Sequence, residues 1–355
     1  MTITEISGPI SMDWEARLLI EVPGWEEPVR ALEFGTTLAG VEEAPFYKLD
    51  FAKVGFATPG WMLVIGNALR EFRRARPNAK RQAINFKHLG YAAHVGFFQY
   101  FGMEYGQAPA QALGSNTYVP VTEVSVAELR SAAAEKSLQV GELIEEDAQR
   151  LARLLTQLNN GDTVETLTYS IREIVRNVVE HSGSQSYSIA AQYWPGKNSA
   201  ELAVSDSGCG ILESLKENPK LQVGNDLDAL KLSLLPGISS KAWRRRNSAD
   251  VWANSGYGLF MTQRLSSLGG EFALLSGSAG MRIVGTETST VDCTAAGTTV
   301  ILRIDAGKVS NLSQRLAEFR DDGARLAKLV GGANKFGPSL ASQVLKPTTK
   351  TDHGL

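Results

Sequence analysis

The 355-residue chain has little cysteine, no long apolar run and no surplus of charge of either sign. Its two cysteines, Cys209 and Cys293, belong to no CxxC pair, which argues against a disulfide framework or a zinc site. No apolar run approaches the roughly 20 residues that span a bilayer. The first residues also lack the basic and then apolar pattern of a signal peptide. We therefore expect a reduced, cytoplasmic protein with no membrane partner.

The charges of the chain nearly balance. It has 36 basic residues (Lys and Arg) and 38 acidic ones, which gives a formal net charge of −2. No overall basic field therefore indicates nucleic acid as a partner. Hydrophobic residues make up 43% of the chain, an ordinary share for a globular protein. At roughly 150 residues per domain, the length allows two domains.

Residues 1–118 are predicted to form a small α/β domain, because short apolar runs alternate there with amphipathic stretches. The expected strands are Ala31–Phe34, Lys48–Val54 and Gln82–Phe86, and the expected helices are Trp61–Arg74 and Ala92–Phe101. The stretch Gln107–Thr117 is rich in Ala, Gly, Pro and Ser and is expected to link the two domains, and residues 119–139 are also assigned to the linker.

A larger domain is predicted over residues 140–306. Helical periodicity marks Leu143–Leu158 and Val164–Glu180, and strands are expected at Ser186–Tyr193 and Glu201–Ser205. For residues 307–355 we expect an amphipathic helix, Val309–Leu329, followed by a loose tail.

The second helix of this domain carries a polar line. Glu173, Asn177 and Glu180 stand at i, i+4 and i+7 and so share one face. The carbonyl oxygen of Asn suits Mg²⁺, and a carboxylate one turn earlier could orient or deprotonate a water. A solvated charged face is the alternative. For His181, which follows this helix, one interpretation is a helix C-terminal cap.

Two glycine-rich turns follow. In the first, Asp206 ends a strand and precedes Gly208 and Gly210, which places a carboxylate beside closely approaching backbone. Such a carboxylate can accept a hydrogen bond from an exocyclic amine, as on adenine; an ordinary Asp-Ser-Gly turn is the alternative. In the second, Gly256 and Gly258 lead into a helical pattern, where backbone N–H groups can bind phosphates.

The order of these residues resembles the GHKL superfamily, which includes gyrase B, heat-shock chaperones, histidine kinases, MutL-like repair proteins and anti-sigma serine kinases. Four family motifs match: ExxxN at Glu173 and Asn177, DxGxG at Asp206, Gly208 and Gly210, GxGL at Gly256, Gly258 and Leu259, and Gly-Thr at Gly297 and Thr298. The resemblance implies an α+β two-layer sandwich, the Bergerat fold, that binds ATP with Mg²⁺.

The resemblance also assigns roles. It implies that Asn177 binds Mg²⁺, that Asp206 binds the adenine amino group and that Glu173 is the general base or orients water. Further nucleotide-binding positions implied are Gly208, Gly210, Gly256, Tyr257, Gly258, Leu259 and Thr298. An ATP lid is expected over about 212–254, where Lys241 would approach the γ-phosphate near Arg244–Arg246. A basic loop without fixed contacts is the alternative for Lys241.

The front region resembles the STAS-like fold in Val54–Trp61, its following helix, Val95–Phe98 and Gly102. STAS domains that switch by phosphorylation carry an Asp-Ser-Ser/Thr-Gly turn, whereas this chain has Ala57-Thr58-Pro59-Gly60. We therefore expect this domain to sense or bind a protein partner rather than to be phosphorylated.

Three functions follow from the resemblance. The first is an ATP-dependent conformational switch with slow ATP hydrolysis. The second is a serine/threonine kinase of the anti-sigma type that acts on a partner STAS protein. The third is an interaction module that binds ATP without turnover. A homodimer is compatible with each of them.

Overall fold

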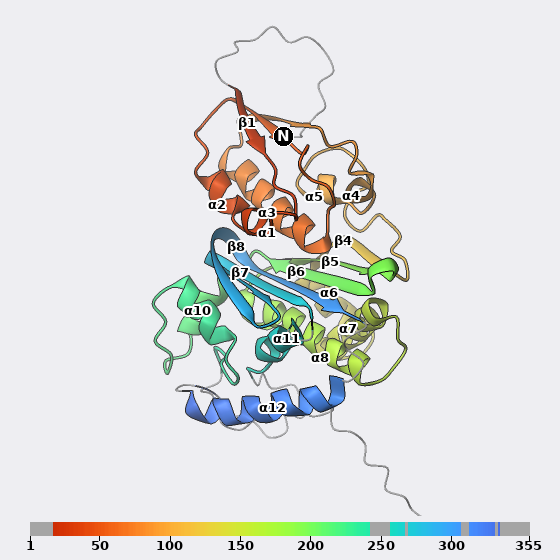
Figure 1. The fold of residues 1–355 in the computed structure, drawn as a ribbon, viewed down its shortest axis with the longest axis vertical. Coiled ribbons are helices and arrows are strands. Elements are labelled where there is room, and N and C mark those ends of the chain that lie inside the picture. The colour runs from red at the N-terminus through yellow and green to blue at the C-terminus, as the bar shows by residue number, and fades with distance from the viewer. Residues whose placement is uncertain (1–16, 242–255, 267–268, 307–311, 331–332, 334–355) are drawn as a thin grey trace, which may run out of the picture.

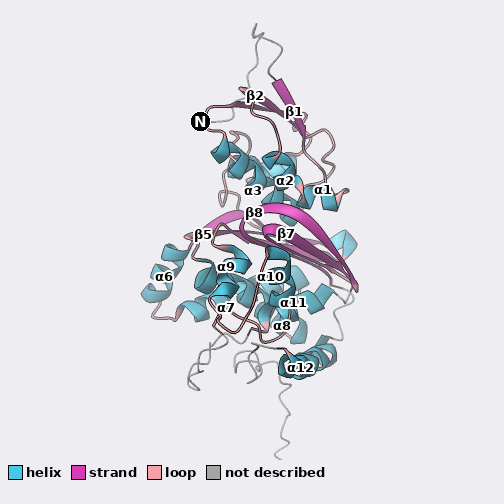
Figure 2. Ribbon diagram, turned by 90° about the vertical axis from the view of Figure 1, so that its left-hand side faces the viewer, coloured by secondary structure: helices cyan, strands magenta, loops and turns pink. Residues whose placement is uncertain are grey.

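The chain folds into a mixed α+β structure with two sheets. A computed structural model describes residues 17–241, 256–266, 269–306, 312–330 and 333. A three-stranded sheet with its helices stacks on one face of a five-stranded sheet, and a second group of helices covers the other face (Figures 1 and 2). Within those ranges, no helix combines the length and apolar character that crossing a membrane would need.

The front unit is built on a parallel sheet with strand order β1-β2-β3. Its elements are β1 (Arg17–Glu21), α1 (Pro28–Leu32), α2 (Phe34–Ala39), β2 (Phe46–Asp50), α3 (Pro59–Ala75), β3 (Lys80–Ile84), α4 (Gly90–His94) and α5 (Phe97–Tyr100). Parallel neighbours need crossover connections, and the helices between these strands supply them. Helix α3 is well specified at its start, because the Thr58 hydroxyl caps the Trp61 N–H at 3.3 Å and Pro59 opens the first turn.

Two expectations for this unit were wrong. The expected strand Ala31–Phe34 lies instead in α1 and α2, where Pro28 opens the first turn and Leu32 and Phe34 are buried. The expected single helix Ala92–Phe101 is broken into α4 and α5, because Gly96 adopts the left-handed region with φ 93°.

The second unit is built on an antiparallel sheet with strand order β4-β5-β6-β8-β7. Its strands are β4 (Tyr118–Ser125), β5 (Ser186–Trp194), β6 (Ser199–Asp206), β7 (Glu271–Val284) and β8 (Glu287–Asp305). Its helices are α6 (Val126–Glu135), α7 (Val140–Thr156), α8 (Asp162–Asn177), α9 (Gly210–Lys216), α10 (Asp226–Ser233), α11 (Gly258–Ser266) and α12 (Leu312–Leu329), with one π-helical turn at Val178–Ser182.

The expected linker, residues 119–139, is part of this second unit. Strand β4 pairs with β5, and α6 begins where the Ser125 hydroxyl accepts a hydrogen bond from Glu128 N at 3.3 Å. Leu129 and Ala133 of α6 are buried in the same core as α7 and α8. The chain therefore enters the second unit at Tyr118. The sequence did not predict this, because an edge strand that pairs with a distant segment leaves only a weak local signal.

The front unit and the five-stranded sheet share one hydrophobic core. Along β6, Leu202 and Val204 face the helices of the second unit, whereas Ala203 between them packs with residues of the front unit. A Cβ on Gly60, in the first turn of α3, would lie 2.8 Å from Ile301 Cγ2 of β8. Small residues on both sides thus let α3 approach the sheet closely, and the sheet is covered on both faces.

Candidate functional site

The pocket that gathers most of the predicted site residues, called the main pocket below, lies on the face of the five-stranded sheet that α8 and α11 cover. It has a volume of about 830 Å³, including solvent at its mouth. It brings together side chains and backbone from α8, the end of β6, α9, α11 and β8. The predicted site residues that line it are Glu173, Asn177, Asp206, Gly210, Gly256, Gly258, Leu259 and Thr298. Glu173 and Thr298, which are 125 positions apart in the sequence, thus meet at one cavity.

Helix α8 holds Glu173 in the pocket wall by means of two arginines. Glu173 Oε1 accepts from Arg172 Nη2 at 3.3 Å and from Arg176 Nη1 at 3.4 Å, and all three side chains are buried. Arg172 also binds Glu145 at 2.6 Å, and Arg176 binds Glu180 at 2.8 Å. Buried charges are tolerated when they are paired in this way.

These ion pairs change the expected picture of the helix face. Glu180, which shares a face with Glu173 and Asn177 in the helical pattern, binds Arg176 and does not line the pocket. Sequence reasoning missed both arginines, although Arg176 stands at the i+3 and i−4 positions that favour ion pairs with Glu173 and Glu180. The helix changes to a π-helical turn directly after Asn177, a feature that often accompanies functional sites.

The second glycine-rich turn, at Gly256 and Gly258, allows two close approaches. A Cβ on Gly258 would lie 2.6 Å from Glu173 Cβ and 3.0 Å from Glu173 Oε2, so only glycine lets the start of α11 reach α8. Gly256 has φ 70°, and its carbonyl accepts from Gly237 N at 2.9 Å. A Cβ on Gly256 would meet the Ile238 carbonyl oxygen at 2.6 Å.

Asp206 lies at the end of β6 with its carboxyl buried. Burial raises the pKa of Asp206 from 3.8 to about 6, although hydrogen bonds from the backbone of Gly208 and Thr298 act in the opposite direction. Gly208 N donates to Asp206 Oδ1 at 2.7 Å. Gly297 has φ 72°, and a Cβ there would lie 2.7 Å from Asp206 Oδ1. The two glycines thus let backbone surround the carboxylate.

Ser276 of β7 supports this side of the pocket and was missed from the sequence. Its buried hydroxyl accepts from Ile211 N at 2.9 Å, donates to the Gly297 carbonyl at 3.0 Å and lies 3.3 Å from Thr298 Oγ1. It therefore joins the two segments that flank Asp206. A lone serine in a strand carries no sequence signal for such a role.

Three predicted residues lie outside the pocket lining. Gly208 packs against the turn after α8, where a Cβ would lie 2.1 Å from the Ser182 carbonyl oxygen. Tyr257 is buried in the core, edge-on to Phe260 at 6.5 Å between ring centroids. Lys241 Nζ donates to the Glu180 carbonyl at 3.3 Å. Gly208 and Tyr257 thus shape the site from behind rather than facing a ligand.

Much of the expected lid, about 212–254, is described. It contains most of α9, all of α10 and a small apolar cluster of Leu215, Ala229 and Ile238. Ser278 N donates to Asp226 Oδ2 at 2.9 Å, which ties α10 to β7. The expected basic triplet Arg244–Arg246 lies outside the described residues.

His181 lines the pocket beside the segment Gly237–Lys241. Its Nδ1 lies 3.2 Å from Ser240 Oγ. Burial, together with the positive charge of Lys241, lowers the pKa of His181 from 6.5 to about 4. The imidazole is therefore neutral at pH 7 and can exchange a hydrogen bond with the serine hydroxyl.

The pocket lining offers few side-chain ligands to a metal ion. Asn177 offers one amide oxygen, and in the described ranges no group of three or more His, Cys, Asp and Glu is placed to hold a metal. A Mg²⁺ ion bound here would take most of its ligands from phosphates and water, as Mg²⁺ commonly does.

Comparison with known proteins gives no family assignment. No protein-family model matches the chain, and no curated protein matches its sequence.

Proposed function

We propose that this chain binds Mg-ATP in the main pocket, in the manner of the GHKL superfamily, and uses it as a conformational switch with slow hydrolysis. The observation that carries the proposal is the meeting of four separate motifs, through Glu173, Asn177, Asp206, Gly258 and Thr298, at one cavity. An antiparallel sheet with helices on the pocket side is compatible with the Bergerat fold.

The adenine end of the ligand is assigned to Asp206. With a pKa of about 6, its carboxyl is ionised at pH 7 and can accept a hydrogen bond from an exocyclic amine. Ser276 and Thr298 support the neighbouring backbone. The apolar wall beside it includes Val204 and Val300, which suits the face of a flat base.

The phosphate end is assigned to the start of α11, where Gly258 opens the helix and lines the pocket, because the free backbone N–H groups at a helix N-terminus can bind phosphates. Asn177 supplies an oxygen ligand for Mg²⁺, which would neutralise phosphate charge. Glu173 is fixed through Oε1 by Arg172 and Arg176, so its orientation is set before a ligand arrives. This arrangement supports a role in orienting a water for attack on the γ-phosphate.

The front unit is proposed to be the STAS-like part through which a protein partner is met. Its turn Ala57-Thr58-Pro59-Gly60 caps α3 and packs on the sheet, with Thr58 buried as the helix cap. A buried capping hydroxyl is a poor phosphate acceptor, which supports an interaction role over self-phosphorylation at this turn.

Calorimetry with Mg-ATP and a phosphate-release assay test the proposal together. Wild type should bind ATP and release phosphate slowly, Glu173→Ala should bind without release, and Asn177→Ala should bind weakly. Glu165→Ala, on the exposed side of the same helix, is the matched control and should behave as wild type.

Each other outcome identifies a different function. Label transfer from γ-labelled ATP to a partner STAS protein, with little free phosphate, would indicate the kinase. Binding without phosphate release by either wild type or Glu173→Ala would indicate an interaction module. Normal ATP binding by both Asn177→Ala and Asp206→Asn would contradict the site assignment.

A further inference from the structure

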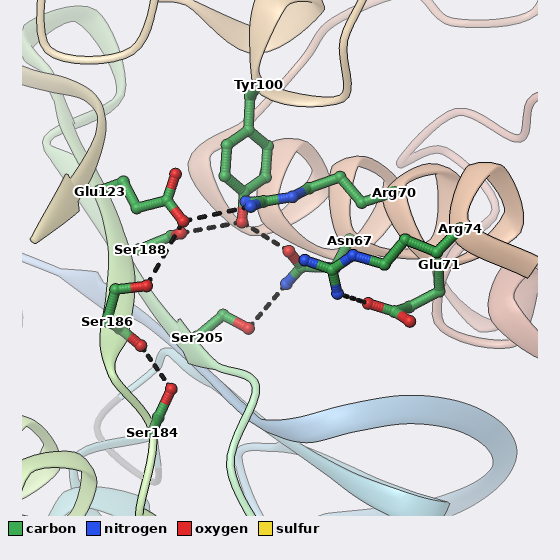
Figure 3. Close-up of polar contacts among 10 residues, drawn as sticks. All are labelled: Asn67, Arg70, Glu71, Arg74, Tyr100, Glu123, Ser184, Ser186, Ser188 and Ser205. Atoms are coloured by element: carbon green, nitrogen blue, oxygen red, sulfur yellow. Dashed lines mark hydrogen bonds and ion pairs between the residues drawn. The ribbon is translucent and has the colours of Figure 1, made fainter. Parts of the chain in front are cut away.

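A polar network connects the front unit to the strands that end at the main pocket (Figure 3). It lies on the face of the five-stranded sheet that the front unit covers, opposite the main pocket. Asn67 of α3 donates through Nδ2 to Ser205 Oγ of β6 at 2.7 Å, and Ser205 Oγ lies 2.7 Å from Thr299 Oγ1 of β8. The Tyr100 hydroxyl of α5 is hydrogen-bonded to Asn67 Oδ1 and lies 2.9 Å from Ser188 Oγ of β5.

The network reaches the back of the proposed adenine site. Ser205 and Thr299 are paired in register across β6 and β8, and each adjoins a pocket residue, Asp206 and Thr298 respectively. Successive side chains of a strand point to opposite faces. The strand pair that presents Asp206 to the pocket is therefore hydrogen-bonded to the front unit on its other face.

Asp206 lies between the main pocket and the front unit. It lines the main pocket, and together with Asn67, Tyr100 and Ser205 it also lines a smaller polar pocket on the front-unit side of the sheet. Only the thickness of one sheet thus lies between the front unit and the carboxyl that would bind adenine.

The chemistry of Asn67 suits a fixed position. Ser205, Thr299 and Tyr100 are all buried, so their hydroxyls need partners within the protein. An amide can donate to one hydroxyl and accept from another at the same time. Arg70 stacks over the Tyr100 ring at 4.5 Å and binds Glu123 at 3.1 Å, which holds the tyrosine in place.

We propose that Asn67 and Tyr100 are positioning residues for the nucleotide site, through which the front unit sets the affinity and base selectivity of ATP binding. The inference rests on the proposed function, because it assigns the adenine end to Asp206. Asn67 acts on the ligand only through Ser205 and Thr299. By linkage, a bound nucleotide would in turn strengthen the docking of the front unit.

The test measures ATP and GTP affinities of the full chain by calorimetry. Asn67→Ala and Tyr100→Phe each remove part of a buried hydrogen-bond pair, and each should weaken ATP binding about threefold to tenfold. The ATP-to-GTP preference should fall with it, because the adenine end is affected. The matched control is Glu71→Gln on the same helix, whose ion pair with Arg74 is joined to the network by no drawn hydrogen bond (Figure 3), and it should bind ATP as wild type does.

A double-mutant cycle separates positioning from general destabilisation. If Asn67 acts through Ser205, the loss of ATP affinity in Asn67→Ala/Ser205→Ala should be smaller than the sum of the single losses. Thermal unfolding without ligand checks each variant, and Tyr100→Phe, which keeps the ring, decides the matter if Asn67→Ala does not fold.

Several results would overturn the inference. Unchanged ATP affinity in Tyr100→Phe and in folded Asn67→Ala would contradict it alone, while the proposed function stands. Equal losses for ATP and GTP with additive single effects would leave these residues a structural role only. Failure of the wild type to bind ATP would overturn both the inference and the proposed function.

Discussion

The substitution Asp206→Asn should stabilise the ligand-free protein while weakening its ATP binding. Burial raises the pKa of Asp206 from 3.8 to about 6. At about 1.4 kcal/mol per pH unit, keeping this carboxylate ionised costs the folded state about 3 kcal/mol at neutral pH. Asparagine retains an oxygen that accepts from Gly208 N and carries no charge. The ligand-free variant should therefore gain up to about 3 kcal/mol in unfolding free energy.

The gain should depend on pH in a defined direction. Because the folded pKa lies above the ordinary value, the stability that protonated Asp206 contributes is present below pH 3.8 and is lost as the pH rises through 6. The advantage of the variant over wild type should thus grow from about 1.5 kcal/mol at pH 5 to about 3 kcal/mol at pH 8. Urea unfolding of both proteins without nucleotide at pH 5, 6, 7 and 8 measures it.

Affinity should move against stability. The asparagine Nδ2 is a donor, so at Asp206→Asn it would face the donor amine of adenine. Calorimetry at pH 8 should show clearly weaker ATP binding than in wild type. Two results would refute the reasoning: a variant no more stable than wild type at pH 8, or a stability difference that stays constant from pH 5 to pH 8.

Three further substitutions have defined expected outcomes. Gly258→Ala adds a methyl group 2.6 Å from Glu173 Cβ and should abolish phosphate release at a cost of about 1–3 kcal/mol in stability; a variant that turns over normally would contradict the close approach. Glu201→Ala removes the buried partner of Arg303 and should lower the urea-unfolding free energy by about 3 kcal/mol, whereas a loss below about 1 kcal/mol would show the pair to be expendable. Ser276→Ala leaves buried backbone groups without their hydroxyl and should cost about 1–3 kcal/mol and weaken ATP binding, as thermal unfolding and calorimetry would show.

Features with a local pattern were readable from the sequence. The helix carrying Glu173 and Asn177 follows from its periodicity, and α8 spans most of the predicted stretch. The two glycine-rich turns stand out as short motifs, and the structure shows why glycine is needed in them: a Cβ would clash with Ser182 at Gly208 and with Glu173 at Gly258. Such constraints leave a mark at fixed positions in the chain.

Features that depend on distant partners were not readable. The segment now seen as β4 and α6 looked like a linker because β4 is defined by its pairing with β5, more than 60 residues later. Ser276 and Arg172 acquire their roles from residues of other elements. Residues 31–34 read as a strand because a short apolar run fits a buried helix equally well.

The residue pattern of β6 indicated that both faces of the sheet are covered, which the expected domain boundaries did not. Strand β6 is buried along its length apart from Ser199, and even Glu201 has no exposed surface. Its run Ala-Glu-Leu-Ala-Val-Ser lacks the apolar-polar alternation of a strand with one solvated face. The absence of this alternation is typical of a sheet that is covered on both sides.

The packing of the front unit on the sheet affects how a conformational switch could work. A front domain joined by a linker could influence the pocket only through the lid or through a partner. Here α3 packs on the sheet, Gly60 N donates to buried Glu201 at 2.7 Å, and Asn67 binds Ser205. Since Ser205 and Asp206 are consecutive residues of one strand, a shift of α3 relative to the sheet has to change either these hydrogen bonds or the position of Asp206. The shortest path between a partner on the front unit and the proposed nucleotide is therefore across the sheet rather than around its edge.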